Sequence, residues 1–267
     1  MDLGVELVLL GAECSGERAF GGSLGAAEGA QRFWRAVTST LVDAGPGRCR
    51  VTTVHPEADA NAALAALQQA TAREGRLLLV YLAGQLTWDA RRRRPVLVVA
   101  GSLRDSAARR GLPCEWVTSA MAHGAAAEAL LVLDLTADQE AWQEWPAWLG
   151  AAAETVPVWG RVARYEPSRR GRTPVRGLAG TLAEAFGRLL DTGLAGAPAV
   201  LDPALLHPAL LALDPDAPQA EGVRGAPEPA VRWSAPPADS RLLLRNRALL
   251  RGLLRGDSRR GSALPGY

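Results

Sequence analysis

Residues 77–89 read LLLVYLAGQLTWD, an apolar run of branched and aromatic side chains that ends at Gly84 and turns polar at Gln85. A continuous apolar run of this length, bounded by a turn signal, predicts a strand that is buried on both faces. Residues 129–138, ALLVLDLTAD, repeat the pattern. In open parallel sheets, functional groups lie just beyond the carboxyl ends of such strands, so these two ends are the first places to look for a site.

The composition is that of a globular protein with a sizeable core. Of the 267 residues, 48% are hydrophobic and 22% are charged, and the formal net charge is +2. This balance argues against nucleic-acid binding, which normally requires a concentrated basic face. No apolar run approaches the ~20 residues that span a membrane, and the N-terminus lacks the basic start of a signal peptide. We therefore expect a cytoplasmic protein without a membrane span.

Apolar strands alternate with amphipathic helices along the chain, which predicts an α/β fold with a mainly parallel sheet and helices on both faces. The expected strands are residues 5–10, 49–54, 77–84, 95–100, 129–138 and 155–164, and the expected helices are residues 26–42, 58–74, 114–123, 181–190 and 203–213. Residues 222–237 predict a loop because they are rich in Pro and Gly, and residues 241–249 fit a strand or a helix. We expect one domain over residues 1–250 and a basic, flexible tail over residues 251–267.

Short motifs stand at the two strand ends: Tyr81, Gly84, Gln85 and Leu86 at the first, and Asp134, Leu135 and Thr136 at the second. They resemble motifs of the caspase-like cysteine peptidases, particularly the bacterial branch common in actinobacteria. In that family, the third strand ends in Tyr-x-x-Gly-His-Gly and the fourth in Asp-x-Cys. The resemblance implies a three-layer caspase-like fold with a six-stranded, mainly parallel sheet.

Weaker matches extend the resemblance over about residues 5–250. The segments are residues 46–49 (PGRC), 112–117 (LPCEWV) and 243–246 (LLRN), and the last of them favours a closing strand within residues 241–249. Gln85 and Thr136 are 51 positions apart, close to the spacing of about 50 residues between the His and Cys of caspases. We therefore expect the two strand ends that carry the peptidase site to lie as in the family, with both catalytic residues replaced.

The replacements at the two dyad positions imply a catalytically inactive protein. Such a peptidase needs a thiolate nucleophile and an imidazole base. The amide of Gln85 does not titrate near neutral pH, and the hydroxyl of Thr136 is a poor nucleophile without a base. Leu86 replaces the glycine after the histidine, which narrows the site. Two interpretations stay open for Gln85 and Thr136: satisfied polar groups at strand ends, or retained ligand recognition.

No other set of residues restores a dyad or a metal site. Cys114 and His123 share a predicted helix, but nine steps place them on opposite faces. Cys14 follows the first strand and could be a relocated nucleophile, although no histidine is placed to assist it. His55 and His207, each followed by a proline, are expected at the surface. The cysteines and histidines lack metal-ligand spacing, so we expect no cofactor.

Trp142, Trp145 and Trp148 follow the second motif at steps of three. They could plug the vestigial pocket, anchor a partner, or pack on the core as one helix face. The resulting candidate cleft comprises Cys14, Gln85, Leu86, Asp134, Thr136, Trp142 and Trp145.

Three functions remain open on this basis. The first is a pseudo-peptidase that serves as a regulatory subunit or scaffold for a protein partner. That partner could be an active caspase-like relative, a co-encoded enzyme, or a second copy paired through a sheet edge. The second is a hydrolase that uses Cys14 or Thr136 as a relocated nucleophile. The third is a pocket converted to sensing a small molecule or peptide.

Overall fold

The computed structural model describes residues 4–13, 25–42, 48–102, 106–165, 181–214 and 229–249. Cys14 and the tail over residues 251–267 lie outside the described residues. The expectations placed on them therefore stay predictions.

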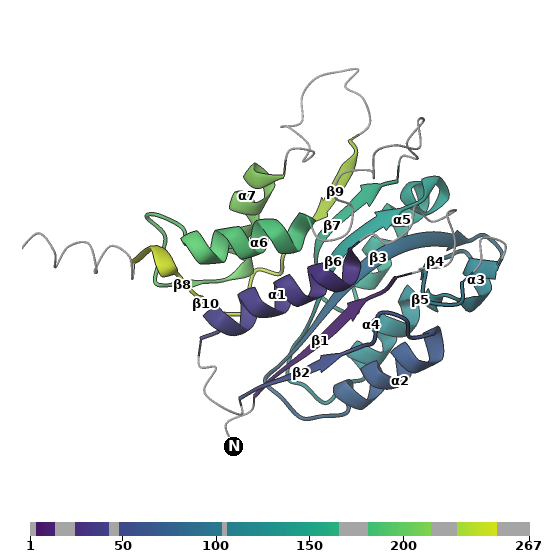
Figure 1. The fold of residues 1–267 in the computed structure, drawn as a ribbon, viewed down its shortest axis with the longest axis horizontal. Helices are drawn as coiled ribbons and strands as arrows, with labels where there is room; N and C mark the ends of the chain where they lie inside the picture. The colour runs from purple at the N-terminus through teal and green to yellow at the C-terminus, as the bar shows by residue number, and fades with distance from the viewer. Residues whose placement is uncertain are drawn as a thin grey trace, which may run out of the picture.

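A mainly parallel sheet forms the centre of the molecule (Figure 1). Its main path runs in the order β2 (Cys49–Thr53), β1 (Val5–Gly11), β3 (Leu77–Asp89), β6 (Ala129–Ala137), β7 (Val158–Arg164) and β9 (Val231–Ser234). The first five strands pair in parallel, and β9 pairs with β7 in the antiparallel direction. The expected mainly parallel sheet is confirmed, with six strands on its main path; two further antiparallel strands, described below, join the sheet off this path and bring its total to eight.

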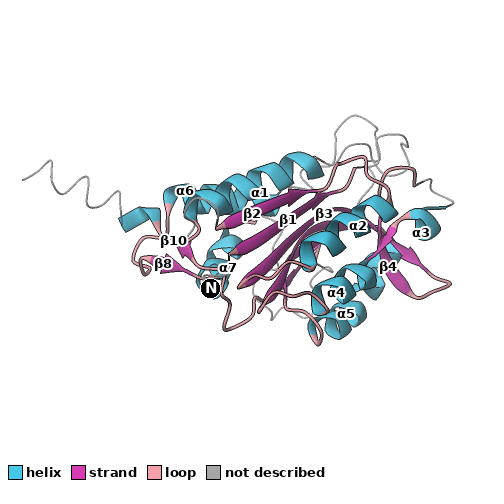
Figure 2. Ribbon diagram, turned by 90° about the horizontal axis from the view of Figure 1, so that it is seen from below, coloured by secondary structure: helices cyan, strands magenta, loops and turns pink. Residues whose placement is uncertain are grey.

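Helices cover both faces of this sheet, which gives three layers (Figure 2). One face carries α1 (Ala26–Thr40), α6 (Thr181–Thr192) and α7 (Pro203–Leu213), and the other carries α2 (Ala60–Thr71), α4 (Cys114–Ala122) and α5 (Gln139–Ala153). The three-layer α/β fold class is confirmed. In the part of the chain described, no helix is both long and apolar enough to cross a membrane.

The apolar runs become central strands because successive side chains enter opposite cores. In β3, Leu79 and Tyr81 belong to the core under α1 and α6, whereas Val80 and Leu82 belong to the core under α2, α4 and α5. Phe33 of α1 stacks on Tyr81 with ring centroids 4.3 Å apart, which joins helix to sheet.

Three of the helices have an aspartate as the N-cap residue. Asp59, Asp138 and Asp202 each accept a hydrogen bond from the backbone N–H three residues later, at the starts of α2, α5 and α7. Such N-caps satisfy one of the otherwise unpaired amides of the first turn and contribute about 1 kcal/mol each.

The third strand is longer than its apolar run. The sequence predicts an end at Gly84, but β3 continues to Asp89 because its last four residues pair with β4 (Arg94–Leu97) in an antiparallel hairpin. The arginine run that begins at Arg91 forms the exposed hairpin turn. Beyond it lie α3 (Ala107–Arg110) and β5 (Leu112–Pro113), which pairs with β4. Gln85 therefore lies within a strand and not beyond its end.

The C-terminal expectations need two corrections. The predicted loop over residues 222–237 contains β9, the edge strand of the main sheet. The predicted closing strand is reduced to β10 (Leu244–Arg245), which pairs with β8 (Val200–Leu201) in a separate two-stranded sheet. One edge of the main sheet is thus formed by β9, a segment flanked by prolines. It becomes a strand because its backbone pairs with β7, which is distant in the sequence.

Candidate functional site

Gln85 and Thr136 are neighbours across the β3–β6 ladder, where their Cα atoms are register partners. Adjacent strands lie about 4.8 Å apart. Both residues face the α1/α6/α7 side, since Tyr81 and Asp134, two or four positions earlier on the same strands, contact residues of that side. The fold therefore brings together Gln85 and Thr136, the two residues that the sequence motifs single out.

Both side chains are buried, yet each has an oxygen without a partner. The exposed fraction is 5% for Gln85 and 0% for Thr136. Within the described part of the chain, Gln85 Oε1 and Thr136 Oγ1 have no hydrogen-bond partner. No partner among the described residues supports the interpretation of satisfied polar groups for these two oxygens. Leaving a buried polar group unpaired costs about 1–3 kcal/mol, so the pair needs a physical explanation.

The three histidines lie away from this pair. His55 is exposed between β2 and α2, and His123 is the exposed C-cap of α4. His207 lies on α7, where its Nδ1 accepts a hydrogen bond from Trp159 Nε1 at 3.3 Å. Its ring is partly buried rather than at the surface as expected. None of these imidazoles is hydrogen-bonded to Thr136, so no described histidine is placed as a base for its hydroxyl.

The described cysteines are poor nucleophiles. Burial raises the pKa of the Cys114 thiol to about 12, and burial together with Glu6 raises the pKa of Cys49. A raised thiol pKa lowers the thiolate fraction on which nucleophilic attack depends. Cys14 lies outside the described residues. Within the described ranges, no group of three His, Cys, Asp or Glu residues is arranged to hold a metal ion.

Asp134, two residues before Thr136, holds the start of α6 against the sheet. Its Oδ2 accepts hydrogen bonds from Tyr81 Oη at 2.9 Å and from the backbone N–H groups of Leu182 and Ala183 at 3.2 and 3.4 Å. A carboxylate at a helix N-terminus is stabilised by the unpaired amides and by the helix dipole. Burial and Asp134 raise the pKa of Tyr81 well above its ordinary value, so its hydroxyl stays protonated as a donor.

Arg161 continues this buried network towards α7. Its Nη1 lies 3.7 Å from Asp134 Oδ1, and its Nε lies 3.3 Å from Asp214 Oδ2. Trp233 Nε1 of β9 donates to the same Asp214 oxygen at 3.0 Å. Arg161 and Asp214 were missed from the sequence, although an arginine amid the apolar residues of β7 is a signal, since unpaired charges are rarely buried.

Three residues of the candidate cleft lie on the opposite side of the sheet. Leu86, Trp142 and Trp145 are buried in the core under α2, α4 and α5. Trp145 packs against Trp148 with ring centroids 4.7 Å apart, and the Arg232 guanidinium lies 4.1 Å from the Trp142 ring centre. Of the interpretations of this tryptophan segment, core packing fits. The described part of the cleft is therefore Gln85, Thr136 and Asp134.

The fold and site define a three-layer α/β protein with a buried polar cluster at the carboxyl end of its central strands. No protein-family model matches the sequence, and no curated protein matches it. Among solved structures, protein GSU0716 from Geobacter sulfurreducens aligns with a TM-score of 0.49 and 12% identity, over 92% of this chain and 98% of that chain.

Proposed function

We propose that the chain is a catalytically inactive, caspase-like protein that acts as a binding or regulatory subunit. One observation carries the proposal: Gln85 and Thr136, the replacements at the base and nucleophile positions, are register partners on one face of the sheet. Two unrelated polar residues 51 positions apart would not need to meet in this way. The pairing supports a retained frame from which the chemistry has been lost.

The local chemistry supports inactivity. A carboxamide cannot take a proton at neutral pH, and a threonine hydroxyl needs a base before it attacks a carbonyl. Tyr81 of β3 and Asp134 of β6, titratable side chains on the same face of the sheet, are hydrogen-bonded to each other, and Asp134 also holds the start of α6. The site therefore holds no free acid–base pair among the described residues.

The sheet edges supply a mode of association for a regulatory subunit. β2 and β9 end the strand order, so each has one side that is not covered by another strand of the described chain. Exposed strand edges template pairing with another chain. A second copy of the chain or an active caspase-like enzyme are the partners proposed. A cytoplasmic location and a protein rather than nucleic-acid partner belong to the same proposal.

Peptidase assays on the native chain and on a restored dyad test inactivity. We expect no hydrolysis of fluorogenic peptide libraries by the native chain. The Gln85→His/Thr136→Cys double variant should gain labelling by a thiol-directed peptide electrophile, and each single variant should gain much less. Hydrolysis by the native chain that is abolished by Thr136→Ala would overturn the proposal and revive the relocated-nucleophile enzyme.

Association is tested by light scattering on the purified chain and by cross-linking in the native host. A homodimer, or reproducible cross-links to one protein that a bait of similar size lacks, is expected. A strictly monomeric chain without specific cross-links would contradict the regulatory role.

A second candidate function, ligand sensing, is favoured by the unpaired oxygens of Gln85 and Thr136. A ligand with adjacent N–H donors would satisfy both, provided that the groups covering these buried oxygens move aside, since Gln85 is 5% and Thr136 0% exposed. A thermal-shift screen of short peptide amides tests this, because a ligand that binds only the folded state raises the melting temperature. The shift should disappear in Thr136→Val. An unchanged shift in that variant, or none in the native chain, would exclude sensing at this pair.

A further inference from the structure

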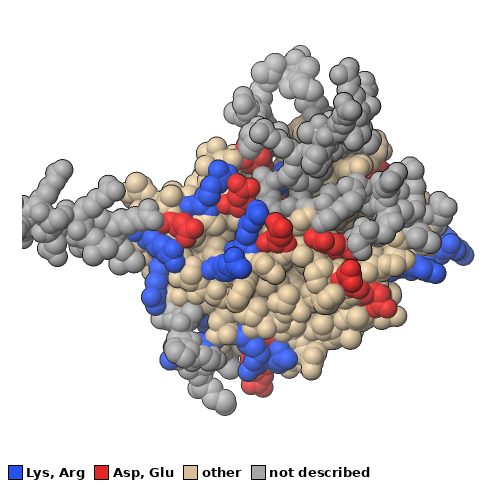
Figure 3. All heavy atoms as spheres, in the orientation of Figure 1, with Lys and Arg blue, Asp and Glu red and all other residues tan. Residues whose placement is uncertain are grey.

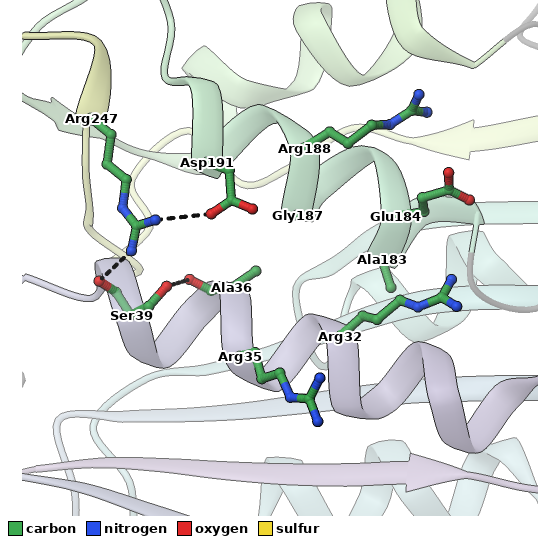
Figure 4. A pocket seen from close by; sticks show the side chains of 10 residues that line it. All are labelled: Arg32, Arg35, Ala36, Ser39, Ala183, Glu184, Gly187, Arg188, Asp191 and Arg247. Atoms are coloured by element: carbon green, nitrogen blue, oxygen red, sulfur yellow. Dashed lines mark hydrogen bonds and ion pairs between the residues drawn. The ribbon is translucent and has the colours of Figure 1, made fainter. Parts of the chain in front are cut away.

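A groove of about 440 Å³ lies between α1 and α6, on the outer side of their layer (Figure 4). Small-molecule sites commonly occupy about 300–1,000 Å³. Ala36, Ala183 and Gly187 contribute small side chains to its lining. A Cβ atom added at Gly187 would meet no heavy atom within 4 Å. The small residues thus leave open a space that larger side chains would fill.

Arg247 closes one end of this groove by bridging the two helices. It donates from Nη1 to Asp191 Oδ1 of α6 at 2.9 Å and from Nη2 to the carbonyl oxygen of Ser39 of α1 at 3.3 Å (Figure 4). The protein therefore holds one guanidinium group in place before any ligand arrives.

The charge of the groove is positive. Its lining includes Arg32, Arg35, Arg188 and Arg247 against Glu184 and Asp191, an excess of two positive charges. Figure 3 shows basic and acidic side chains interspersed over the face that carries α1 and α6, so this excess is local.

Two of these arginines have no side-chain partner within the described ranges. Arg32 pairs with Glu28 at 3.2 Å and Arg247 with Asp191. In contrast, Arg35 and Arg188 form no side-chain hydrogen bond or ion pair with the described part of the chain, and both are exposed. In Figure 4 they extend along the outer sides of α1 and α6, and Arg32 lies nearer the gap. Exposed side chains of this length can turn inward when a ligand offers a counter-charge.

We propose that this groove binds a small molecule that carries two adjacent phosphate groups. The planar guanidinium presents its donors as a fork that matches phosphate oxygens in pairs. Arg35 belongs to α1 and Arg188 to α6, on the two walls of the groove, so we assign one phosphate group of the pair to each helix. The inference goes beyond the proposed function, because Gln85 and Thr136 are not among the lining residues.

Calorimetric titration of the full chain with inorganic pyrophosphate at low ionic strength tests the inference. We expect saturable binding with one site per chain. Arg35→Gln and Arg188→Gln should each weaken binding by about tenfold, the effect of losing one hydrogen-bonded charge. Arg91→Gln in the exposed β3–β4 turn removes the same charge elsewhere and should leave the affinity within about twofold. Glu184→Gln should tighten binding.

Folding does not confound this comparison, because all four side chains are exposed and thermal unfolding can verify each variant. Absence of saturation with millimolar pyrophosphate would overturn the proposal. The proposal would also be overturned if Arg91→Gln weakened pyrophosphate binding as much as the groove variants do. Such a result would show that binding depends on net charge and not on the groove. Failure here leaves the Gln85–Thr136 proposal untouched, since its tests measure peptidase labelling and association.

Discussion

On the α2/α4/α5 side of the sheet, β3 and β6 present only apolar side chains, such as Leu82 and Leu133. On the α1/α6/α7 side, the same two strands present Tyr81, Asp134, Gln85 and Thr136 towards their carboxyl ends. Each of the two strands thus contributes apolar side chains to one core through alternate residues and contributes to a buried polar cluster on the opposite face through the others. The α2/α4/α5 face can be explained by packing alone, whereas the other face carries charges and unpaired oxygens that packing does not need.

The largest expected effect comes from the polar face. Asp134→Ala removes the carboxylate that pairs Arg161 and accepts from Tyr81 and the start of α6. We expect the free energy of unfolding, measured in urea, to fall by about 3–5 kcal/mol, because Arg161 becomes an undercompensated buried charge. Asp138→Ala, which removes an N-cap carboxylate outside this network, should cost only about 1 kcal/mol. Equal costs would show that the network adds nothing to stability.

The second-largest effect on stability is expected on the α2/α4/α5 face, at Leu133, the residue before Asp134. Leu133→Ala should lower the free energy of unfolding by about 3 kcal/mol through lost burial and a residual cavity. Because no charge is involved, this cost should be the same at low and high salt. A strong salt dependence would contradict the view that this face is held by packing alone.

A smaller effect with the opposite sign is expected at Thr136. Thr136→Val keeps the shape and removes a buried hydroxyl without a partner, so it should raise the free energy of unfolding by up to about 1 kcal/mol. Thr118 is the matched control, because its buried hydroxyl donates to the Glu115 carbonyl at 3.2 Å. Thr118→Val should be destabilising. Destabilisation by Thr136→Val would mean that its hydroxyl is satisfied in solution.

The smallest effect is a pH dependence at His207. Burial lowers the pKa of His207 below its usual value of about 6.5. The unfolded chain then binds the proton more readily, so stability is fully present above about pH 6.5 and decreases as the pH falls towards the lowered folded pKa. Protonation of Nδ1 would also end its hydrogen bond from Trp159. Urea unfolding between pH 8 and pH 5 should show this loss in the native chain and a flatter profile in His207→Gln; identical profiles would contradict it.

Much of the fold could be predicted from the sequence. The runs that became β1, β3, β6 and β7 are largely apolar because central parallel strands are buried on both faces. The motifs at the ends of β3 and β6 also identified Gln85 and Thr136, which the register then brought together. These predictions succeeded because they depend on hydrophobic runs and short motifs, which are local in the sequence.

The missed features depend on distant partners. β9 has four residues in a Pro-rich stretch and exists as a strand because it pairs with β7. Trp142 and Trp145 were assigned to the cleft because they follow Thr136 in the sequence, but α5 packs them on the other face. The pairing of Arg161 with both Asp134 and Asp214 joins residues that no local pattern connects.

The sequence by itself determined the alternation of strands and helices, the mainly parallel sheet, and the identity of the two residues at the motif positions, because hydrophobic periodicity and side-chain chemistry are local properties. Only the tertiary structure decided which face each residue occupies. It also decided that Gln85 and Thr136 lie side by side with unpaired oxygens, that Asp134 and Arg161 form a buried ion pair, and that arginines of α1 and α6 line one groove. These depend on strand register and helix packing, which bring together residues far apart in the chain.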